Sequence, residues 1–468
     1  MKKLLPLLAL AALALPARAV TLDTTQFGKY AEFTASGNVS GDVNVANLPV
    51  PVHFSASNIG GLDYNDIGLT KQDAYSTLRF ADANGDNLDY EIATWNPSGE
   101  SIIWVSVPSI KNKTTKFTAY FAPDAGYTLP AVYPTNVWTK AGYIGVWHLD
   151  EKVNGQYEDA SGVTGPVGPV DANASYPDPT AVTAYGVGNY LANNAAGLFI
   201  PASVSANWDF GDTGLTFEAW ALPGGDWEIL LSNTNATKLV GKGNPGGFMI
   251  AVAQNKIRWS TKGDGWQNTK AENNWSAYAS EWRHLAVMYR PSTSSKGCLY
   301  LGYPEHGTQP NFGKVDAAAI PPTRANGFTF DNGCYLMRSA GNTILGVDEI
   351  RIRASETEQV WYKANYLAQT SGFLTYAAVK VTGAKISSTG ITASSPSYST
   401  ATVSGTFDVD SSVSGNVSVS LVVSPAGGTA YTVPNVGTIS TSSTSVCNVQ
   451  LDDLLPGTAY AVNFQVTY

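Results

Sequence analysis

Residues 88–110, LDYEIATWNPSGESIIWVSVPSI, contain two apolar segments separated by a short polar stretch. In the first segment, Leu88, Tyr90 and Ile92 occupy every second position, and polar or small residues lie between them. Side chains of a β-strand point alternately to opposite faces, so this spacing is typical of a half-buried strand. With the Pro- and Gly-containing turn that follows, the stretch predicts two β-strands joined by a turn.

The same pattern recurs along the 468 residues, and segments with helical periodicity are nearly absent. Charged residues make up 14% of the chain and aromatic residues 11%, a composition that favours short strands joined by turns. We therefore predict an all-β, multi-domain protein built from sandwiches. One helix is expected within residues 355–369, starting with a capping box formed by Ser355 and Glu358.

The chain begins with MKKLLPLLALAALALPARA, in which two lysines precede an apolar run from Leu4 to Leu15. The run ends at the small-x-small sequence Ala17-Arg18-Ala19, so residues 1–19 are predicted to be a secretory signal peptide. This run is shorter than the roughly 20 residues of a membrane-spanning helix, and no later segment is long enough. We expect an exported protein, located in the periplasm, on the cell surface or in the medium, with no transmembrane segment.

Charge and cysteine content restrict the expected partners and cross-links. The net charge is −9 and no basic tract occurs, so nucleic acid and anionic membranes are not expected partners. Of the three cysteines, Cys298 and Cys334 could form a disulfide in an oxidising compartment, and Cys447 would then be unpaired. The chain is large enough to bury its own cores, so its folding does not depend on this disulfide. Both the paired and the unpaired state of the two cysteines therefore stay as alternatives.

Three blocks follow the signal peptide, at residues 20–140, 141–378 and 379–468. The middle block contains four segments in the order of one family: GYIGVWHLDE (142–151), GLTFEAWALP (214–223), EWRHLAVMYR (281–290) and CYLMRSAGNTILGVDEIRI (334–352). Together they resemble the laminin-G-like, concanavalin-A-type lectin and glucanase sandwich. The resemblance implies a central jelly-roll sandwich.

The two flanking blocks resemble other families. PVPVHFSAS (49–57), the stretch 76–110 and FTAYFA (117–122) resemble a bacterial domain of unknown function, number 2341 of that series, which commonly precedes a lectin-like sandwich on exported proteins. LDDLLPGTAYAVNFQVTY (451–468) resembles the end of a fibronectin type III domain. We therefore expect an N-terminal β-sandwich and a C-terminal fibronectin- or immunoglobulin-like sandwich. The core-facing residues of the latter would be Leu454, Tyr460, Val462 and Phe464.

The stretch GVDEIRIRAS (346–355) places two carboxylates side by side. In a regular strand, Asp348 would share one face with the isoleucines, and Glu349, Arg351 and Arg353 would share the other. The two carboxylates would point apart, whereas a glycosidase needs both across one cleft. We therefore assign no catalytic residues here and expect Glu349 and the arginines to form a solvated ion-pair face.

Asp348 on an apolar face needs either hydrogen-bond donors or a cation. The resemblance to the lectin-like family implies a structural Ca²⁺ near the first and last strands of the sandwich. Asp150, Asp159 and Asp348 are the candidate ligands, because calcium prefers oxygen donors. The alternative is that the same acids cap turns.

Several other polar residues are expected to be structural. Asp82, Asn84 and Asp86 alternate as in a calcium-binding EF-hand loop. Such a loop requires Gly at its sixth position and Glu at its twelfth, where this sequence has Asn87 and Ala93, so we expect a type I′ hairpin turn at Asn84-Gly85. Asp89 and Glu91 would share one face of a half-exposed strand without a catalytic role. His148 and His284 lie in strand-like segments and are expected to be packed.

Exposed aromatic residues indicate a possible ligand site. Trp266 and Trp275 fall in polar, Gly- and Asn-rich loops, where their rings could stack on sugars. Asp264, Gln267 and Asn274 would supply hydrogen bonds. The alternative is that these loops fold back and bury both rings.

We predict a non-enzymatic binding or adhesion protein that recognises glycans or other envelope polymers through the sandwich loops. One alternative is a glycoside hydrolase, which the lectin-like family also includes, but the Glu-x-Asp-x-(x)-Glu strand of those enzymes is missing from this sequence. The other alternative is a structural envelope component without a ligand. Fold alone does not decide between these functions.

Overall fold

The computed structural model describes the chain in segments, and all structural statements concern these segments. They are residues 20–35, 44–111, 114–150, 152–169, 180–181, 189–192, 198–205, 213–223, 227–232, 249–253, 256–261, 265–268, 282–290, 297–303, 311–316, 333–339, 344–369, 372–381, 386–394, 399–409, 417–439, 445–456 and 458–467. Strands predominate in several sheets, which confirms the predicted all-β class. The described residues fall into two compact units, those within 1–24 and 31–379 and those within 25–30 and 380–468.

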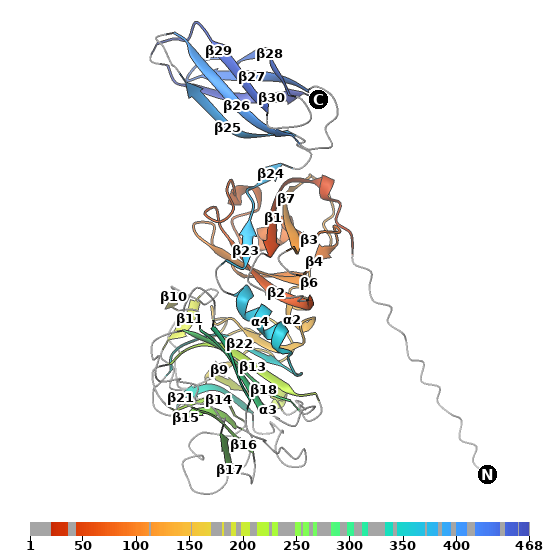
Figure 1. The fold of residues 1–468 in the computed structure, drawn as a ribbon, viewed down its shortest axis with the longest axis vertical. Coiled ribbons are helices and arrows are strands. Elements are labelled where there is room, and N and C mark those ends of the chain that lie inside the picture. Colours follow the sequence, from red (N-terminus) through yellow and green to blue (C-terminus); the bar gives the residue numbers. More distant parts are fainter. Residues whose placement is uncertain are drawn as a thin grey trace, which may run out of the picture. The chain divides into compact units, whose positions relative to one another are not determined.

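Two antiparallel sheets form the first half of the larger unit (Figure 1). One runs in the order β23 (Leu374–Tyr376), β1 (Phe27–Ala35), β7 (Lys116–Pro123), β3 (Arg79–Asp82) and β4 (Asn87–Leu88). The other runs β2 (Asn44–Phe54), β6 (Ser101–Lys111) and β5 (Tyr90–Thr94). The two strands predicted within residues 88–110 are present as β5 and β6, with Ile92 opposite Ile103, but Leu88 belongs to β4 of the other sheet.

Short helices connect these strands. They are the 3-10 helices η1 (Thr24–Gln26) and η2 (Tyr64–Asp66) and the α-helices α1 (Lys71–Thr77) and α2 (Asn136–Thr139). α1 begins with a capping box, in which the side chain of Thr70 accepts from the backbone of Asp73 and the side chain of Asp73 accepts from the backbone of Thr70. This box satisfies N–H groups at the helix start that have no partner within the helix.

The second half of the larger unit contains two larger sheets. The eight-stranded sheet runs β10 (Thr180–Ala181), β11 (Asn189–Ala192), β22 (Ile344–Arg353), β13 (Leu215–Pro223), β18 (Arg283–Tyr289), β19 (Gly297–Tyr303) and β20 (Asn311–Asp316), with β8 (Tyr143–Trp147) also on β22. The seven-stranded sheet runs β17 (Gly265–Asn268), β16 (Lys256–Thr261), β15 (Met249–Ala253), β14 (Trp227–Ser232), β21 (Cys334–Ser339), β12 (Leu198–Ile200) and β9 (Gly168–Pro169). The short helix α3 (Ala202–Ser205) follows β12.

One hydrophobic core extends through both halves of this unit. It contains Trp104 of β6, Trp138 of α2, Tyr143 of β8 and Trp220 of β13. Trp361 of the helix α4 (Gln359–Ala368) joins the same core, and its indole N–H donates to the Ala46 carbonyl of β2 at 3.0 Å. The first and second sequence blocks therefore share buried surface.

The predicted helix within residues 355–369 is present as α4, but it begins later than expected. Glu358 is the N-cap and makes no side-chain capping hydrogen bond, so the predicted capping box is wrong. The Ser355 carbonyl instead accepts from the Thr216 hydroxyl at 2.9 Å. This contact with β13 holds the segment before Glu358 in a non-helical conformation.

The predicted hairpin turn at Asn84-Gly85 joins β3 to β4, but its type differs. The Gly85 N–H donates to the Asp82 carbonyl at 3.0 Å, and Gly85 has a φ of 83°. Asn84 is not among the non-glycine residues with positive φ, whereas type I′ requires positive φ at both central positions. The Asp82 carboxylate accepts from the backbone N–H groups of Asn84 and Asp86, which stabilises this conformation.

The smaller unit consists mainly of two three-stranded sheets. They are β25 (Ile386–Ser394), β26 (Ala401–Val409) and β29 (Ser445–Leu451), and β28 (Tyr431–Ile439), β27 (Val417–Pro425) and β30 (Tyr460–Thr467). β24 (Lys380–Val381) pairs with the beginning of β1. The four predicted core-facing residues pack, partly buried, against a cluster around Leu421. The fibronectin-like family of this unit stays a prediction.

Candidate functional site

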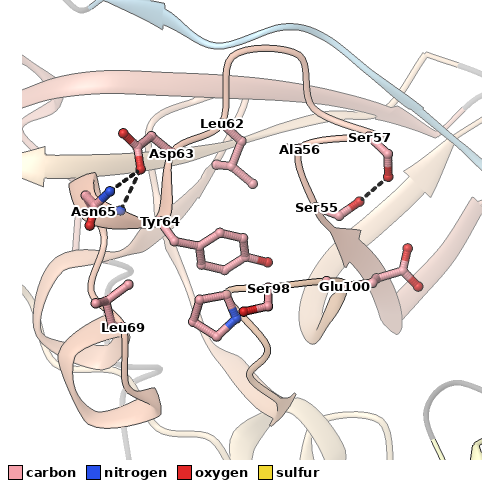
Figure 2. Close-up of a pocket in the computed structure, with 12 residues that line it drawn as sticks. Ser55, Ala56, Ser57, Leu62, Asp63, Tyr64, Asn65, Leu69, Ser98 and Glu100 are labelled. Atoms are coloured by element: carbon pink, nitrogen blue, oxygen red, sulfur yellow. Dashed lines mark hydrogen bonds between the residues drawn. The ribbon is translucent and has the colours of Figure 1, made fainter.

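A pocket lies on the first half of the larger unit, where β2 ends and β6 begins (Figure 2). Phe54 of β2 lies opposite Ser101 of β6, so the chain leaves one strand and enters the other at the same end of the sheet. Residues from the stretch 55–69 and residues 97–100 line a cavity of about 590 Å³. Pockets that bind small molecules typically have volumes of about 300–1,000 Å³.

Tyr64 forms the floor of this pocket, and Figure 2 shows its ring between the two lining segments. Its hydroxyl donates to the Phe54 carbonyl at 2.6 Å and lies 3.0 Å from the Ser101 hydroxyl. Its ring meets Trp95 edge to face, with 5.1 Å between the ring centroids. Burial raises the pKa of Tyr64, although hydrogen bonding with Ser101 lowers it. The floor is therefore a neutral phenol that is already held in place before a ligand binds.

The rim of the pocket carries two carboxylates and several neutral polar groups. Asp63 caps η2, and one of its oxygens accepts from the backbone N–H of Asn65 at 2.9 Å and from its side-chain amide at 2.8 Å. Glu100 accepts from His53 Nδ1 at 2.8 Å and from Asn58 Nδ2 at 3.1 Å. The hydrogen bond from His53 is the largest cause of the lowered pKa of Glu100, and burial opposes it.

A segment far along the chain supports the pocket wall. The His53 N–H donates to the Tyr376 hydroxyl of β23 at 3.1 Å, and the Val379 N–H donates to the Gly60 carbonyl at 2.8 Å. Tyr376 and Val379 thus hold the loop that follows β2. The pocket therefore depends on residues 374–379 as well as on the segments that line it.

The sequence pattern did not indicate this pocket. Its residues come from SASNIGGLDYND (55–66), NPSGE (96–100) and Leu69, and both stretches read as ordinary turns rich in Gly, Ser and Asn. The one available signal is the presence of Leu62 and Leu69 among polar loop residues, of which Leu69 is 60% exposed.

The stretch 346–355 differs from its predicted alternation. Asp348, Glu349 and Arg351 are all fully buried, so the predicted solvated ion-pair face is wrong. Glu349 has a φ of 53°, and the register of β22 against β13 shifts between Glu218 and Trp220. Such a β-bulge interrupts the regular alternation of a strand, so side chains next to it do not follow the two-residue period.

Glu349 belongs to a chain of buried charges that joins the two halves of the unit. His148 lies between two carboxylates, with Nδ1 at 2.8 Å from Glu349 and Nε2 at 3.3 Å from Glu91. Burial alone would lower the pKa of His148, but both carboxylates outweigh it and raise the pKa well above its ordinary value. Burial alone would raise the pKa of Glu91, but His148 and the Trp138 indole lower it overall. The predicted packing of His148 is confirmed, with the histidine as a buried cation.

Asp89 and Glu91 were expected on a half-exposed strand face, but Asp89 is 8% exposed. Its carboxylate accepts from the Tyr133 N–H at 3.0 Å, from the Asn136 amide at 2.9 Å and from Lys140 at 2.7 Å. These donors tie β5 to the segment that contains α2, which is a structural role for this carboxylate.

Arg351 continues the buried chain of charges. Its guanidinium donates to Glu349 at 2.7 Å and lies over the rings of Trp104, 4.4 Å from the centroid, and Trp138, 4.9 Å from the centroid. A guanidinium is well suited to this position because it is planar and combines stacking with paired hydrogen bonds. This cluster of charges fixes β22 against the first half of the unit.

The three candidate calcium ligands do not form one site among the described residues. Asp159 accepts from the N–H groups of Val146, Ser161, Thr164 and Gly165 and from the Ser161 hydroxyl. Asp348 Oδ1 accepts from the Glu349 N–H at 2.8 Å, and its other oxygen makes no hydrogen bond within the described residues. Burial, together with Glu349 and Asp150, raises the pKa of Asp348 well above its ordinary value.

No group of three His, Cys, Asp or Glu side chains that could hold a metal ion occurs in the segments that the structure describes. The donors around Asp159 correspond to the turn-capping alternative for this residue. Calcium stays a prediction, as does its assignment to Asp150 and Asp348.

The predicted glycan-binding residues lie largely outside the described part of the chain. Trp266 and Gln267 belong to β17, whose side chains are not described, and Asp264, Asn274 and Trp275 lie outside the described residues. The predicted disulfide is also untested: Cys298 lies in β19 and Cys334 in β21 of the other sheet, and the Cys298 side chain is not described.

His284 is packed as predicted, is 1% exposed and is hydrogen-bonded to the Tyr362 hydroxyl. Burial and the nearby Arg351 lower the pKa of His284 well below its ordinary value. His284 is therefore neutral, in contrast to His148.

Glu218 gives the buried cluster a testable pH dependence. Burial raises its pKa, although Arg351 and Arg353 oppose this shift, and its carboxyl group is hydrogen-bonded by Tyr143 and Asn365. A pKa raised by folding stabilises the protein below the unfolded value, and this stabilisation is lost as the pH rises through the folded value. We expect wild type to lose stability relative to Glu218→Gln as the pH rises above the ordinary pKa of a glutamate and through the raised pKa of the folded state, by about 1.4 kcal/mol for each pH unit between the two pKa values. Urea unfolding across this range measures it, and parallel pH profiles would contradict it.

Comparisons with known proteins cover part of the chain. Residues 74–126 match the family model Domain of unknown function (DUF2341). The binding domain of botulinum neurotoxin serotype D is similar in structure, with a TM-score of 0.31, 12% identity and coverage of 49% of this chain and 51% of that one. The binding domain of botulinum neurotoxin DC in complex with SialylT gives a TM-score of 0.32, 12% identity and coverage of 49% and 52%. No curated protein matches the chain. The chain thus spans about half the length of these two structures and is similar to the DUF2341 family over residues 74–126.

Proposed function

We propose that this protein binds carbohydrate without catalysing a reaction, and that the pocket formed by residues 55–69 and 97–100 is a binding site. The observation that carries the proposal is the pocket itself, a cavity of about 590 Å³ with an apolar floor and a polar rim. Sugars need this combination, because their rings present C–H faces together with hydroxyl groups that both donate and accept hydrogen bonds.

The apolar and polar surfaces of the pocket lie close enough together to contact one ligand. Leu62, Tyr64 and Pro97 line it, and Leu69 extends the apolar surface outward. Ser98 adds an exposed hydroxyl from the turn between β5 and β6. Because the floor is fixed by hydrogen bonds and ring contacts, little conformational entropy is lost when a ligand binds there.

Binding fits this pocket better than hydrolysis does. A glycoside hydrolase needs a carboxylic acid that keeps its proton near neutral pH. The hydrogen bonds from His53 and Asn58 instead stabilise the charged form of Glu100 and lower its pKa. Glu100 therefore has no proton to donate to a leaving group at neutral pH.

Export is part of this proposal, with residues 1–19 as a signal peptide and the mature protein acting outside the cytoplasm. The loops that contain Trp266 and Trp275 would provide a further glycan contact, and residues 379–468 would serve as a spacer or an additional contact surface. No helix within the described segments combines the length and the apolar character that a membrane crossing requires.

The proposal is tested by screening residues 20–468 against a glycan array and measuring the best ligand by calorimetry. Replacing Ser98 by tryptophan would fill the pocket and is expected to weaken binding at least about tenfold. The backbone N–H of Ser98, which donates to Asn96, is unaffected by this change.

The matched control is Ser76→Trp, an exposed position on α1 that does not line the pocket. We expect it to bind as wild type does. If Ser98→Trp also binds as wild type does, the ligand occupies another surface, such as the sandwich loops. If no glycan binds, the carbohydrate proposal is wrong.

A further inference from the structure

We infer that the pocket selects saccharides that carry a free amino group over neutral and acidic saccharides. The inference rests on the proposed carbohydrate binding and adds the chemical class of the ligand. It follows from the charges that surround the cavity and from the hydrogen-bonding state of its two carboxylates.

The charged side chains that line the cavity are both acidic. Asp63 lies on one lining segment and Glu100 on the other, and neither Lys nor Arg lines the cavity. His53 beside Glu100 is the one ionisable base hydrogen-bonded to either carboxylate within the described residues. The whole chain carries a net charge of −9, so its long-range field also attracts cations and repels anions.

The two carboxylates differ in what they still offer a ligand. Both oxygens of Glu100 already accept hydrogen bonds, one from His53 and one from Asn58. Both bonds of Asp63 are made through Oδ1, and its Oδ2 accepts none from the described residues. Asp63 is exposed at the rim, so Oδ2 is open to solvent as an acceptor of full charge.

The identity of the ligand decides whether covering Asp63 costs free energy. A neutral sugar displaces water from the carboxylate and replaces it only with neutral hydrogen bonds. An acidic sugar also adds electrostatic repulsion between its own carboxylate and that of Asp63. A protonated amine replaces the lost water with a charge-assisted hydrogen bond, which is stronger than a neutral one. The remaining lining groups suit a sugar, since Ser98 is a hydroxyl and Asn65 an amide.

The test compares three tetramers by calorimetry at neutral pH: glucosamine, N-acetylglucosamine and galacturonic acid. We expect the glucosamine tetramer to bind about fivefold to tenfold tighter than the N-acetylated one and the acidic one to bind weakest. The preference should shrink as the salt concentration rises, because this contact lies at the surface.

Asp63→Asn removes the charge and keeps the side-chain oxygen that caps η2, so it is expected to fold. It should bring the affinity for the glucosamine tetramer to within about twofold of that for the N-acetylated tetramer. Asp124→Asn is the matched control, because Asp124 is exposed and does not line the pocket. It should leave the preference unchanged.

Equal affinities for the two tetramers, or a preference that survives in Asp63→Asn, would overturn this inference and leave the proposed function standing. Failure of every saccharide to bind would overturn both. A lysine-containing tetrapeptide is measured alongside, and tighter binding of this peptide than of the glucosamine tetramer would assign the pocket to peptides instead of saccharides.

Discussion

Replacing Arg351 by leucine is expected to lower the free energy of unfolding by about 3–5 kcal/mol, because it removes one of the two cations that balance the buried carboxylate of Glu349. Arg351 is fully buried, donates to Glu349 at 2.7 Å and lowers the pKa of Glu218 through its charge. Its stacking on Trp104 would be lost as well. Urea unfolding of residues 20–468, followed by tryptophan fluorescence, measures the change.

The control for this variant is Lys116→Leu, which removes an exposed cation from β7 and is expected to change stability by less than about 0.5 kcal/mol. The double variant Arg351→Leu with Glu349→Gln is expected to recover part of the loss, because it removes both charges of the pair. If Arg351→Leu costs no more than Lys116→Leu, the buried ion pair is contradicted.

Residues 20–140 expressed alone are expected not to fold cooperatively, whereas residues 20–381 are expected to fold. β1 pairs with β23, and the indole of Trp361 donates to the Ala46 carbonyl of β2. Glu91 is hydrogen-bonded to His148, so a cut at residue 140 separates a buried carboxylate from its cation. Circular dichroism and thermal melting of both fragments measure the outcome.

The control is residues 380–468, whose core is built from residues 403–464 alone. This fragment is expected to melt cooperatively by itself. A cooperative melt of residues 20–140 would show that the first block is independent and would support the predicted three-domain division. Loss of folding in residues 20–381 would show that the larger unit needs the rest of the chain.

The local pattern of the sequence was sufficient for the strands. The alternation of Leu88, Tyr90 and Ile92 predicted one strand, which the structure divides into β4 with Leu88 and β5 with Tyr90 and Ile92, and the apolar segment that begins at Ser101 predicted β6. In the structure all three side chains are buried. Such predictions succeed because a strand with one apolar face is stable against any apolar layer that covers this face. The identity of the covering layer does not have to be known.

The same reasoning was wrong where tertiary packing changed the local geometry. The period predicted a solvated Glu349, but the bulge in β22 gives this residue a positive φ and its carboxylate lies within the buried cluster. A bulge arises from the pairing of two strands far apart in the sequence, so the sequence of β22 alone does not reveal it. The capping box predicted at Ser355 was wrong for a similar reason, since the contact with Thr216 comes from another strand.

The sequence by itself determined the all-β class, the strands within residues 88–110 and the packing of His148 and His284, because these follow from periodicity and polarity along short segments. Only the tertiary structure decided where charges meet. His148 and Glu349 are 201 positions apart, and His53 and Tyr376 are 323 positions apart. Contacts of this separation depend on strand order and register, which arise from the packing of the whole unit and leave no local signal in the chain.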